Sequence, residues 1–345
     1  MKSCDLLIKD TTALIKSVCL MEHVDLAIQD GKILEVGEGI GDSYEADEQL
    51  EGRSKLFMPG LIDSHMHTGQ QLLKGLVLDA KPIIWTRIML PFESTMTRKR
   101  MALSARLAAL EMIKSGTTGF VDAGSYFMEE AAEVFVESGL RGALSCSTMD
   151  EEGLPQSIAM NADEAVAQTD RLYEAFHGKG NLKVYYALRA LNSCSTSLAL
   201  KAAEHAGERN TMLQAHMNEY QGEVDGMIAR EGMRPYEYLE KLGILNEHFL
   251  GAHSLLLSER EKELIQERGA ILCHCPFSNC GKAVPDTPDL LRRGILVGMG
   301  TDGAAHGGLS LWNEMKIFRS VMNICKGVPQ KNPSIMPATT ILRMV

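Results

Sequence analysis

Apolar and polar positions follow a strand-like pattern over the first part of the chain. Within residues 1–57, short apolar runs are separated by polar turns. The turn Asp30-Gly31 lies between the runs 24–29 and 32–36, and Asp-Gly between two such runs is typical of a tight hairpin. We therefore expect a small β-domain here.

From residue 58 onward, apolar runs of strand length alternate with stretches of helix length. Such alternation predicts a parallel sheet, and eight units predict a closed (β/α)8 TIM barrel over residues 58–345. The stretch 68–97 is predicted to be a long loop. The strand candidates are 58–67, 119–122, 142–146, 183–188, 212–216, 249–253, 270–273 and 296–301. The helix candidates between them are 99–115, 129–138, 162–177, 198–208, 235–242, 258–268 and 286–293.

Four of these strand candidates end in side chains that can bind a metal ion. The first ends in His65-x-His67, and residues two apart on a strand face the same side, so both imidazoles can reach one ion. The others end at His216, His253 and Asp302. In a parallel barrel the carboxyl ends of the strands carry the active site. Neutral imidazoles with a carboxylate form a ligand set suited to zinc or ferrous iron. The predicted metal ligands are His65, His67, His216 and Asp302.

These motifs together resemble one enzyme family. The opening 59–67 (Pro-Gly-Leu-Ile-Asp-Ser-His-Met-His), the pair His216-x-x-Glu219 and the sequence 300–303 (Gly-Thr-Asp-Gly) are similar to those of the amidohydrolase superfamily. The similarity is greatest to the branch of guanine, cytosine and adenosine-derivative deaminases and triazine chlorohydrolases. It extends from about Leu6 to the end of the chain and implies a metal-dependent hydrolase.

The resemblance also implies the domain organisation. Residues 1–57 would be half of a β-sandwich-like domain, and residues 58–345 the (β/α)8 catalytic barrel. In the family, further strands from the C-terminal part complete the small domain. Here the predicted helices 309–326 and 339–345 end the chain, so we expect an α/β protein whose small domain is incomplete at the C-terminus.

Glu219 is the predicted proton shuttle. A metal-bound water has a lowered pKa and becomes a nucleophile. Attack on a ring carbon also needs a proton on the neighbouring ring nitrogen, and a carboxyl group beside the metal can supply it. Asp302 can accept the proton of the water. The resemblance implies that His253 orients this water, and ligation by His253 is the alternative.

The resemblance favours a single metal. Members of the superfamily with two metals commonly carry a carboxylated lysine at the end of the fourth barrel strand. Here that candidate strand ends at Leu188-Arg189, and arginine does not form such a bridge. We therefore expect one divalent metal, Zn or Fe.

Four residues are expected to bind the substrate. In guanine deaminases a glutamine and an arginine at the places of Gln70 and Arg189 hold the amide edge of the ring, and relatives keep a tryptophan and a glutamate matching Trp85 and Glu93. Arginine suits an oxo group, whereas deaminases of adenosine derivatives tend to have histidine at this place. An amino-oxo purine or pterin, such as guanine, is therefore favoured. The alternatives are a structural ion pair for Arg189 and ordinary loop packing for Trp85 and Glu93.

The predicted function is hydrolytic removal of an exocyclic amine from a heteroaromatic ring, that is, cleavage of a carbon–nitrogen bond in a cyclic amidine. One alternative is a chlorohydrolase or a deaminase of triazines or adenosine derivatives on the same scaffold. The other is a metal-poor binding protein without catalysis. Ammonia release would identify a deaminase, and a metal assay would identify the binding protein.

Net charge, cysteine usage and the lengths of apolar segments limit the classes of partner and the cellular compartments that we expect. The net charge of −10 argues against a nucleic-acid backbone as partner. Eight cysteines without a framework favour a reducing compartment. Lys9 and Asp10 interrupt the apolar start, which is unlike a signal peptide, and no stretch is long and apolar enough for a membrane span. We expect a cytoplasmic protein that binds a small heteroaromatic molecule, with homo-oligomerisation left open.

Overall fold

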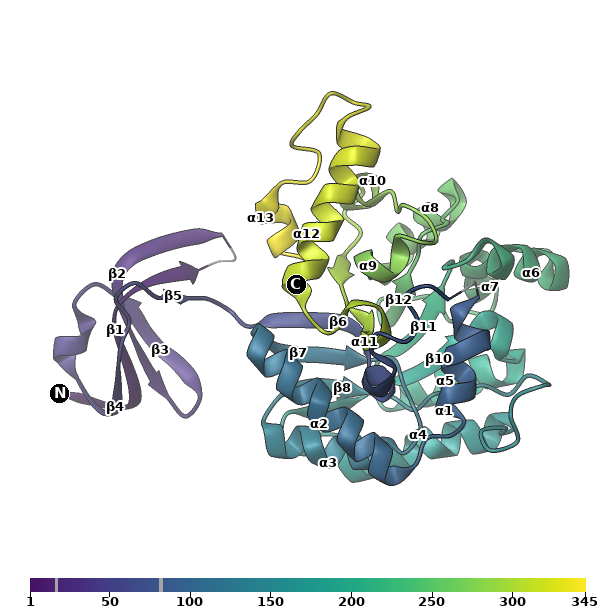
Figure 1. Ribbon diagram of the computed structural model, residues 1–345, viewed down its shortest axis with the longest axis horizontal. Coiled ribbons are helices and arrows are strands. Elements are labelled where there is room, and N and C mark those ends of the chain that lie inside the picture. Colours follow the sequence, from purple (N-terminus) through teal and green to yellow (C-terminus); the bar gives the residue numbers. More distant parts are fainter. Residues whose placement is uncertain (16–17, 81–82) are drawn as a thin grey trace. The chain divides into compact units, whose positions relative to one another are not determined.

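The computed structural model describes residues 1–15, 18–80 and 83–345. They form two compact units (Figure 1). One unit consists of Met1–Gly60 with Ala338–Arg343, and the other of Leu61–Pro337 with Met344–Val345. The domain division between residues 57 and 58 stays a prediction.

The first unit contains a five-stranded sheet in the order β3-β2-β1-β4, with β5 paired to β1. Strands β2 and β3 form the predicted antiparallel hairpin. Its turn residues Asp30 and Gly31 have φ values of 51° and 70°, which is the left-handed backbone that a two-residue type I′ turn requires. The strands are β1 (Lys2–Ile15), β2 (Cys19–Gln29), β3 (Lys32–Gly37), β4 (Tyr44–Glu51) and β5 (Leu56–Phe57).

The second unit contains two five-stranded parallel sheets, in the orders β15-β6-β7-β8-β9 and β10-β11-β12-β13-β14. Single short breaks separate β9 from β10, at Tyr185, and β14 from β15, at Gly300 and Thr301. The predicted mixed α/β architecture with parallel strands is confirmed. The strands are β6 (Leu61–His67), β7 (Thr117–Asp122), β8 (Arg141–Leu144), β9 (Leu182–Val184), β10 (Tyr186–Ala190), β11 (Leu213–Met217), β12 (Phe249–His253), β13 (Ile271–His274), β14 (Val297–Met299) and β15 (Asp302–Gly303).

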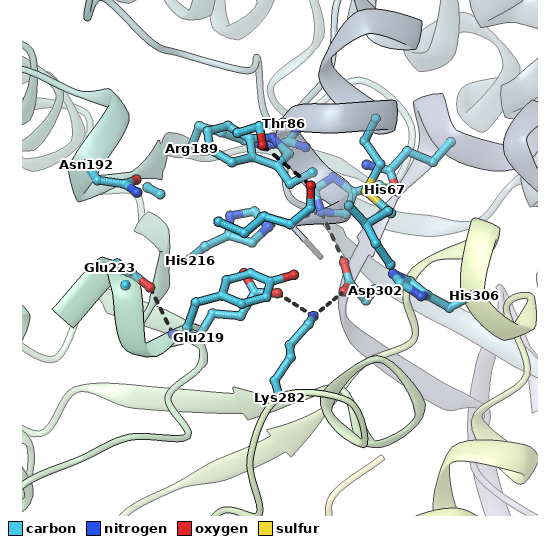
Figure 2. A pocket seen from close by; sticks show the side chains of 18 residues that line it. His67, Thr86, Arg189, Asn192, His216, Glu219, Glu223, Lys282, Asp302 and His306 are labelled. Atoms are coloured by element: carbon cyan, nitrogen blue, oxygen red, sulfur yellow. Dashed lines mark hydrogen bonds and ion pairs between the residues drawn. The ribbon is translucent and has the colours of Figure 1, made fainter. Parts of the chain in front are cut away.

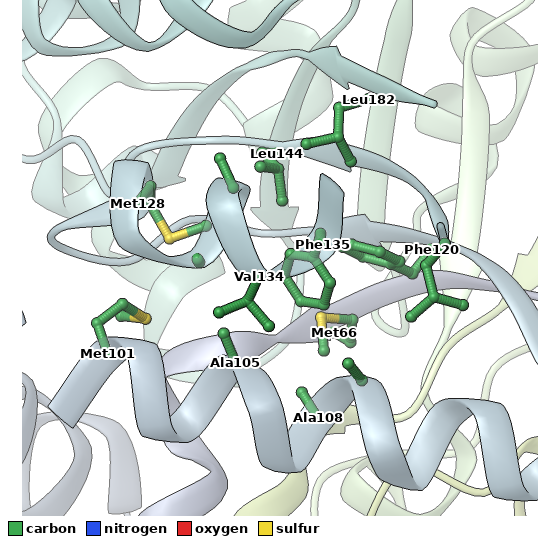
Figure 3. Packing of buried hydrophobic residues seen from close by; sticks show 14 of the residues in the cluster. Met66, Met101, Ala105, Ala108, Phe120, Met128, Val134, Phe135, Leu144 and Leu182 are labelled. Atoms are coloured by element: carbon green, nitrogen blue, oxygen red, sulfur yellow. The ribbon is translucent and has the colours of Figure 1, made fainter. Parts of the chain in front are cut away.

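Helices follow most of these strands. Helix α2 begins after the N-cap Thr97, whose side chain accepts from Arg100 N, and ends at Gly116 with φ 81°. It packs with α3 against β7 and β8, and alanine, methionine and phenylalanine side chains fill the space between them (Figure 3). The longer helices are α2 (Arg98–Ser115), α3 (Met128–Ser138), α4 (Ala162–Phe176), α5 (Thr196–Glu208), α7 (Pro235–Lys241), α8 (Glu259–Arg268), α10 (Thr287–Arg292) and α12 (Leu311–Met322).

Several helical segments differ from the sequence-based expectation. The predicted loop 68–97 contains η2 (Thr68–Leu73) and one continuous helical stretch formed by η3 (Trp85–Met89) and α1 (Leu90–Glu93). The first is too short to produce an amphipathic period, and the second contains Pro91, which lowers helix propensity. Helix α6 (Gln221–Glu231) was also not predicted, because its two glycines lower helix propensity. The remaining short helices are η1 (Ile40–Ser43), η4 (Leu191–Ser193), α9 (Pro276–Asn279), α11 (Ala304–Gly307), η5 (Asn323–Gly327) and α13 (Ala338–Leu342).

Within the described residues, none of the helices combines the length and the apolar character that a membrane crossing requires.

Candidate functional site

Strand pairing brings the predicted metal ligands together at the carboxyl ends of the parallel strands. Asp302 pairs with Met66, so it lies between His65 and His67 on the neighbouring strand. Met66 points the other way and packs in the hydrophobic core. His216 comes from β11, and the ligand atoms of all four residues lie within 4.8 Å of one another.

Distances within this group are short. His67 Nε2 lies 3.1 Å from His216 Nε2 and 3.3 Å from Asp302 Oδ1. His65 Nε2 lies 3.7 Å from the same carboxylate oxygen. Zinc bonds of ~2.0–2.1 Å in a tetrahedral site place neighbouring ligand atoms about 3.3 Å apart. The separations therefore match those of ligands around one ion.

The protonation and hydrogen bonding of these residues also fit a metal. Both ring nitrogens of His65 and Nδ1 of His67 are buried without a hydrogen-bond partner among the described residues. Burial lowers the pKa of His65 to about 4 and holds the pKa of His216 well below its usual value. Their imidazoles are thus neutral near pH 7, the form in which histidine binds a metal.

Asp63 and Gly300, which lie close to the ligands in the sequence, hold the two strands that carry them together. Asp63 accepts hydrogen bonds from His65 N at 3.2 Å and from Thr301 Oγ1 at 2.6 Å, which ties β6 to the residue before Asp302. A Cβ atom at Gly300 would lie 2.4 Å from His65 O, so only glycine allows this approach. Asp302 itself has φ 59°, a strained value of the kind that clusters at functional sites.

Glu219 and His253 lie beside this group. Glu219, His253 and Asp302 have ligand-capable atoms within 4.8 Å of one another, and Glu219 Oε1 is 3.7 Å from His253 Nε2. The other ring nitrogen of His253, Nδ1, is 3.0 Å from Asn279 Oδ1, which fixes the ring. Burial raises the pKa of Glu219, but the charges of His253 and Lys282 outweigh it and hold the pKa below its usual value.

A cavity of about 200 Å³ opens onto these residues (Figure 2). Gln70, Trp85 and Arg189 line it, as do His67, His216, Glu219 and Asp302. The Arg189 guanidinium lies 5.8 Å from the centre of the Trp85 ring. Three of the four residues expected to bind substrate therefore face the same space as the metal ligands.

Glu93, the fourth, lies behind this cavity and lines a neighbouring one. Its Oε1 accepts from Gln70 Nε2 at 2.8 Å and from Arg189 Nη2 at 3.2 Å. The ion pair is deeply buried, with 3% of Arg189 and 1% of Glu93 exposed. The structural ion pair considered for Arg189 is therefore present, and it coexists with the position of Arg189 at the cavity wall.

Each of these residues keeps a polar atom free of hydrogen bonds within the described part of the chain. Arg189 Nη1 and Trp85 Nε1 are free donors, and Gln70 Oε1 and Glu93 Oε2 are free acceptors. Buried polar groups are normally paired, so such a set indicates a ligand with both donors and acceptors.

Among the cavity residues that the sequence analysis did not identify, Lys282 and Glu223 lie next to Glu219. Lys282 is buried beside Glu219, and its Nζ contacts Glu219 Oε1. Glu223 accepts from Glu219 N at 2.9 Å, and burial raises its pKa to about 8. Lys282 follows the short helix α9, and the sequence around it has no regular pattern that could have indicated its place in the cavity.

Cys275 belongs to a further group of side chains that could hold a metal. Its sulfur and ring nitrogens of His65 and His253 lie within 4.8 Å of one another. Burial raises the pKa of the Cys275 thiol well above its usual value. The thiolate that a metal needs is therefore disfavoured, and the group of three histidines with Asp302 fits better.

Comparison with known proteins agrees with this arrangement. The model of the amidohydrolase family matches residues 56–345. A 5'-deoxyadenosine deaminase of Methanothrix thermoacetophila is 30% identical over 338 residues, which cover 97% of this chain and 78% of that protein. A 5-methylthioadenosine/S-adenosylhomocysteine deaminase of Thermococcus onnurineus is 32% identical over 326 residues, covering 93% and 74%.

Solved structures share the fold. An adenosine deaminase from Xanthomonas campestris with bound zinc has a TM-score of 0.91 at 24% identity, covering 99% of this chain and 78% of that one. A guanine deaminase from C. acetobutylicum with bound guanine has a TM-score of 0.91 at 21% identity, covering 98% and 84%. At these identities the similarity establishes the fold and leaves the substrate open.

Proposed function

The chain belongs to the amidohydrolase family, and on that basis we propose that it is a metal-dependent hydrolytic deaminase of adenosine derivatives. The observation that carries the reaction type is the group of buried neutral histidines with Asp302, beside the carboxylate of Glu219. The substrate class rests on the relatives, which act on 5'-deoxyadenosine and 5-methylthioadenosine by name. Guanine, favoured by the sequence, lacks this support, and the adenosine-derivative alternative takes its place.

The proposed chemistry assigns each residue one task. His65, His67, His216 and Asp302 would hold one divalent metal, which when bound supplies a water that is nucleophilic near neutral pH. Glu219 is ionised at neutral pH because its pKa is lowered. It can therefore take a proton from the water and pass it to the ring nitrogen next to the carbon under attack. His253, fixed by Asn279, orients the water.

The products follow from this sequence. Water adds to the ring carbon that bears the amine, and the ring nitrogen gains a proton. The carbon–nitrogen bond to the amine then breaks, and the hydroxyl proton of the added water moves to the departing amine. Ammonia leaves, and the ring keeps the oxygen as a carbonyl and the proton on its nitrogen. Because Arg189 lines the cavity and its Nη1 has no hydrogen-bond partner within the described residues, we expect Arg189 Nη1 to bind a ring acceptor.

The test is ammonia release from a substrate panel, with zinc-loaded and iron-loaded protein. The panel contains 5'-deoxyadenosine, 5'-methylthioadenosine, S-adenosylhomocysteine, guanine, a pterin and a chlorotriazine. We expect the highest kcat/KM for one of the adenosine derivatives. Ammonia from guanine or the pterin alone would contradict the substrate class. Chloride release would support a chlorohydrolase, and metal-free inactive protein would support the binding-protein alternative.

We also propose that the strands of the second unit close into the eight-stranded barrel typical of this fold. The segment 182–190 pairs with β8 through β9 and with β11 through β10. The segment 297–303 likewise pairs with β13 through β14 and with β6 through β15. Treating each segment as one strand gives every strand two neighbours, which supports closure.

A further inference from the structure

Lys282 is a buried cation that the mechanism above does not use. Only 7% of its side chain is exposed. Its Nζ contacts Glu219 Oε1 and donates to Ser278 Oγ at 2.7 Å. The ammonium also lies 4.0 Å from Asp302 Oδ2. Figure 2 shows it between the carboxylates of Glu219 and Asp302.

The two oxygens of Asp302 face different partners. Oδ1 faces the ring nitrogens of His65 and His67, at 3.7 and 3.3 Å. Oδ2 accepts from Ser278 Oγ at 2.6 Å and is the oxygen nearer to Lys282. The ammonium is therefore on the side of the carboxylate away from the histidines, so it does not compete with a metal for the same oxygen.

Electrostatics explain why a charged lysine is buried here. Glu219 and Asp302 are neighbouring carboxylates in a buried site, and like charges at short distance repel. A buried ammonium is in turn unfavourable unless it is paired and hydrogen-bonded. Lys282 satisfies both requirements, because it lies against Glu219 and Ser278 and close to Asp302.

We propose that Lys282 is a positioning residue for catalysis: it holds Oε1 of Glu219, so that Oε2 carries the proton between water and ring. The side chain of Lys282 does not exchange a proton with the substrate in this scheme. This inference rests on the proposed function, since it assigns Glu219 the proton transfer. It extends that function by coupling Glu219, through Lys282 and Ser278, to the metal ligand Asp302.

The kinetic test uses K282M, which keeps an unbranched side chain shorter by one atom and removes the charge. Misplacing a catalytic group by about 1 Å can reduce the rate about 10²-fold. We expect kcat of K282M to fall by about 10- to 100-fold on the best substrate, with KM nearly unchanged and the metal retained. K326M is the matched control, because Lys326 pairs with Asp286 at 3.0 Å away from the cavity residues. It should behave as wild type.

A double-mutant cycle separates positioning of Glu219 from a general structural effect. Residues that act as a unit have non-additive effects. In the E219Q background, K282M should therefore reduce kcat by less than about 3-fold. Losses that multiply, or a K282M variant whose KM rises at unchanged kcat, would overturn the proposal. If K282M does not fold, K282Q provides the same test.

Crystal structures of zinc-loaded wild type and K282M give a readout that needs no turnover. We expect the Glu219 carboxylate to leave its position in K282M, with His65, His67, His216 and Asp302 unchanged. A Glu219 carboxylate in the same place in both structures would overturn the proposal. If wild type releases no ammonia from any ring, the proposed function fails, and the crystal structures still decide the role of Lys282.

Discussion

Individual atoms, more than whole residues, determine what this site can do. Asp302 directs Oδ1 to the histidines and Oδ2 to Ser278. Glu93 directs Oε1 to Gln70 and Arg189, and its Oε2 has no hydrogen-bond partner in the part of the chain that the structure describes. A sequence identifies such residues but not the oxygen that each presents. The predictions at this scale therefore depend on single contacts.

Removing one ligand should remove the metal. Wild type is expected to hold about one Zn or Fe per chain, and H65A and D302A are each expected to lose it, because the remaining ligands cannot complete the set. Elemental analysis of purified protein is the measurement. H205A is the control, since His205 pairs with Asp170 at 3.1 Å. Two metals per chain would contradict the single-metal interpretation.

Loss of Arg189 should affect both binding and stability. R189A removes a donor at the cavity and leaves Glu93 charged in a buried place. Breaking a buried ion pair in this way reduces the free energy of unfolding by about 3–5 kcal/mol. We expect denaturant unfolding to report such a loss, and kinetics to report a raised KM.

The double variant R189M/E93Q separates the two effects of Arg189. Replacing both partners leaves no unpaired buried charge, so stability should largely return while KM stays raised. A wild-type KM in R189M/E93Q would show that Arg189 serves only the ion pair.

Among the elements, strands were predictable and short helices were not. The predicted strand 249–253 matches β12, because a buried parallel strand is an unbroken apolar run between polar segments. The strand predicted at 183–188 is divided at Tyr185 into β9 and β10. Helix α9, only four residues long, carries Ser278 and Asn279 to the site, and a segment of that length has no periodicity to detect.

The contact between α12 and α9 should make stability depend on pH. Glu314 on α12 accepts from Phe277 N at 2.8 Å, and burial raises the pKa of Glu314 from 4.5 to about 8. Between these values the folded protein keeps a proton that the unfolded chain releases, so stability falls as pH rises. The slope from this group is at most about 1.4 kcal/mol per pH unit.

E314Q tests this contribution, because glutamine keeps the acceptor and does not ionise. In thermal unfolding, E314Q should be more stable than wild type at pH 8. The difference in stability between the two proteins should shrink towards pH 4.5. A difference that does not change with pH would mean that Glu314 is already ionised in the folded protein.

For the whole molecule, the sequence was sufficient for the family and the reaction type but not for the substrate. The grouping of the four predicted ligands could be expected from the sequence, because each lies at the end of an apolar strand and the motifs are specific; their binding of a metal stays a prediction. Arg189 led to a preference for an amino-oxo ring. In the folded chain, however, its guanidinium forms an ion pair with Glu93, so a substrate oxo group is not needed to explain the arginine. Lys282 lies in a segment without a regular pattern, so only the folded chain brings it to Glu219.

The claim that this site performs hydrolytic deamination depends most directly on Glu219. E219Q keeps the size of the side chain and an oxygen that can accept from Lys282, so the metal should remain bound. Gln cannot carry a proton, and loss of a general acid–base group reduces rates by about 10²–10⁴-fold. The measurement is the rate of ammonia release per metal-bound chain. We predict that E219Q falls by at least about 10²-fold, and a rate within a few-fold of wild type would contradict the proposed mechanism.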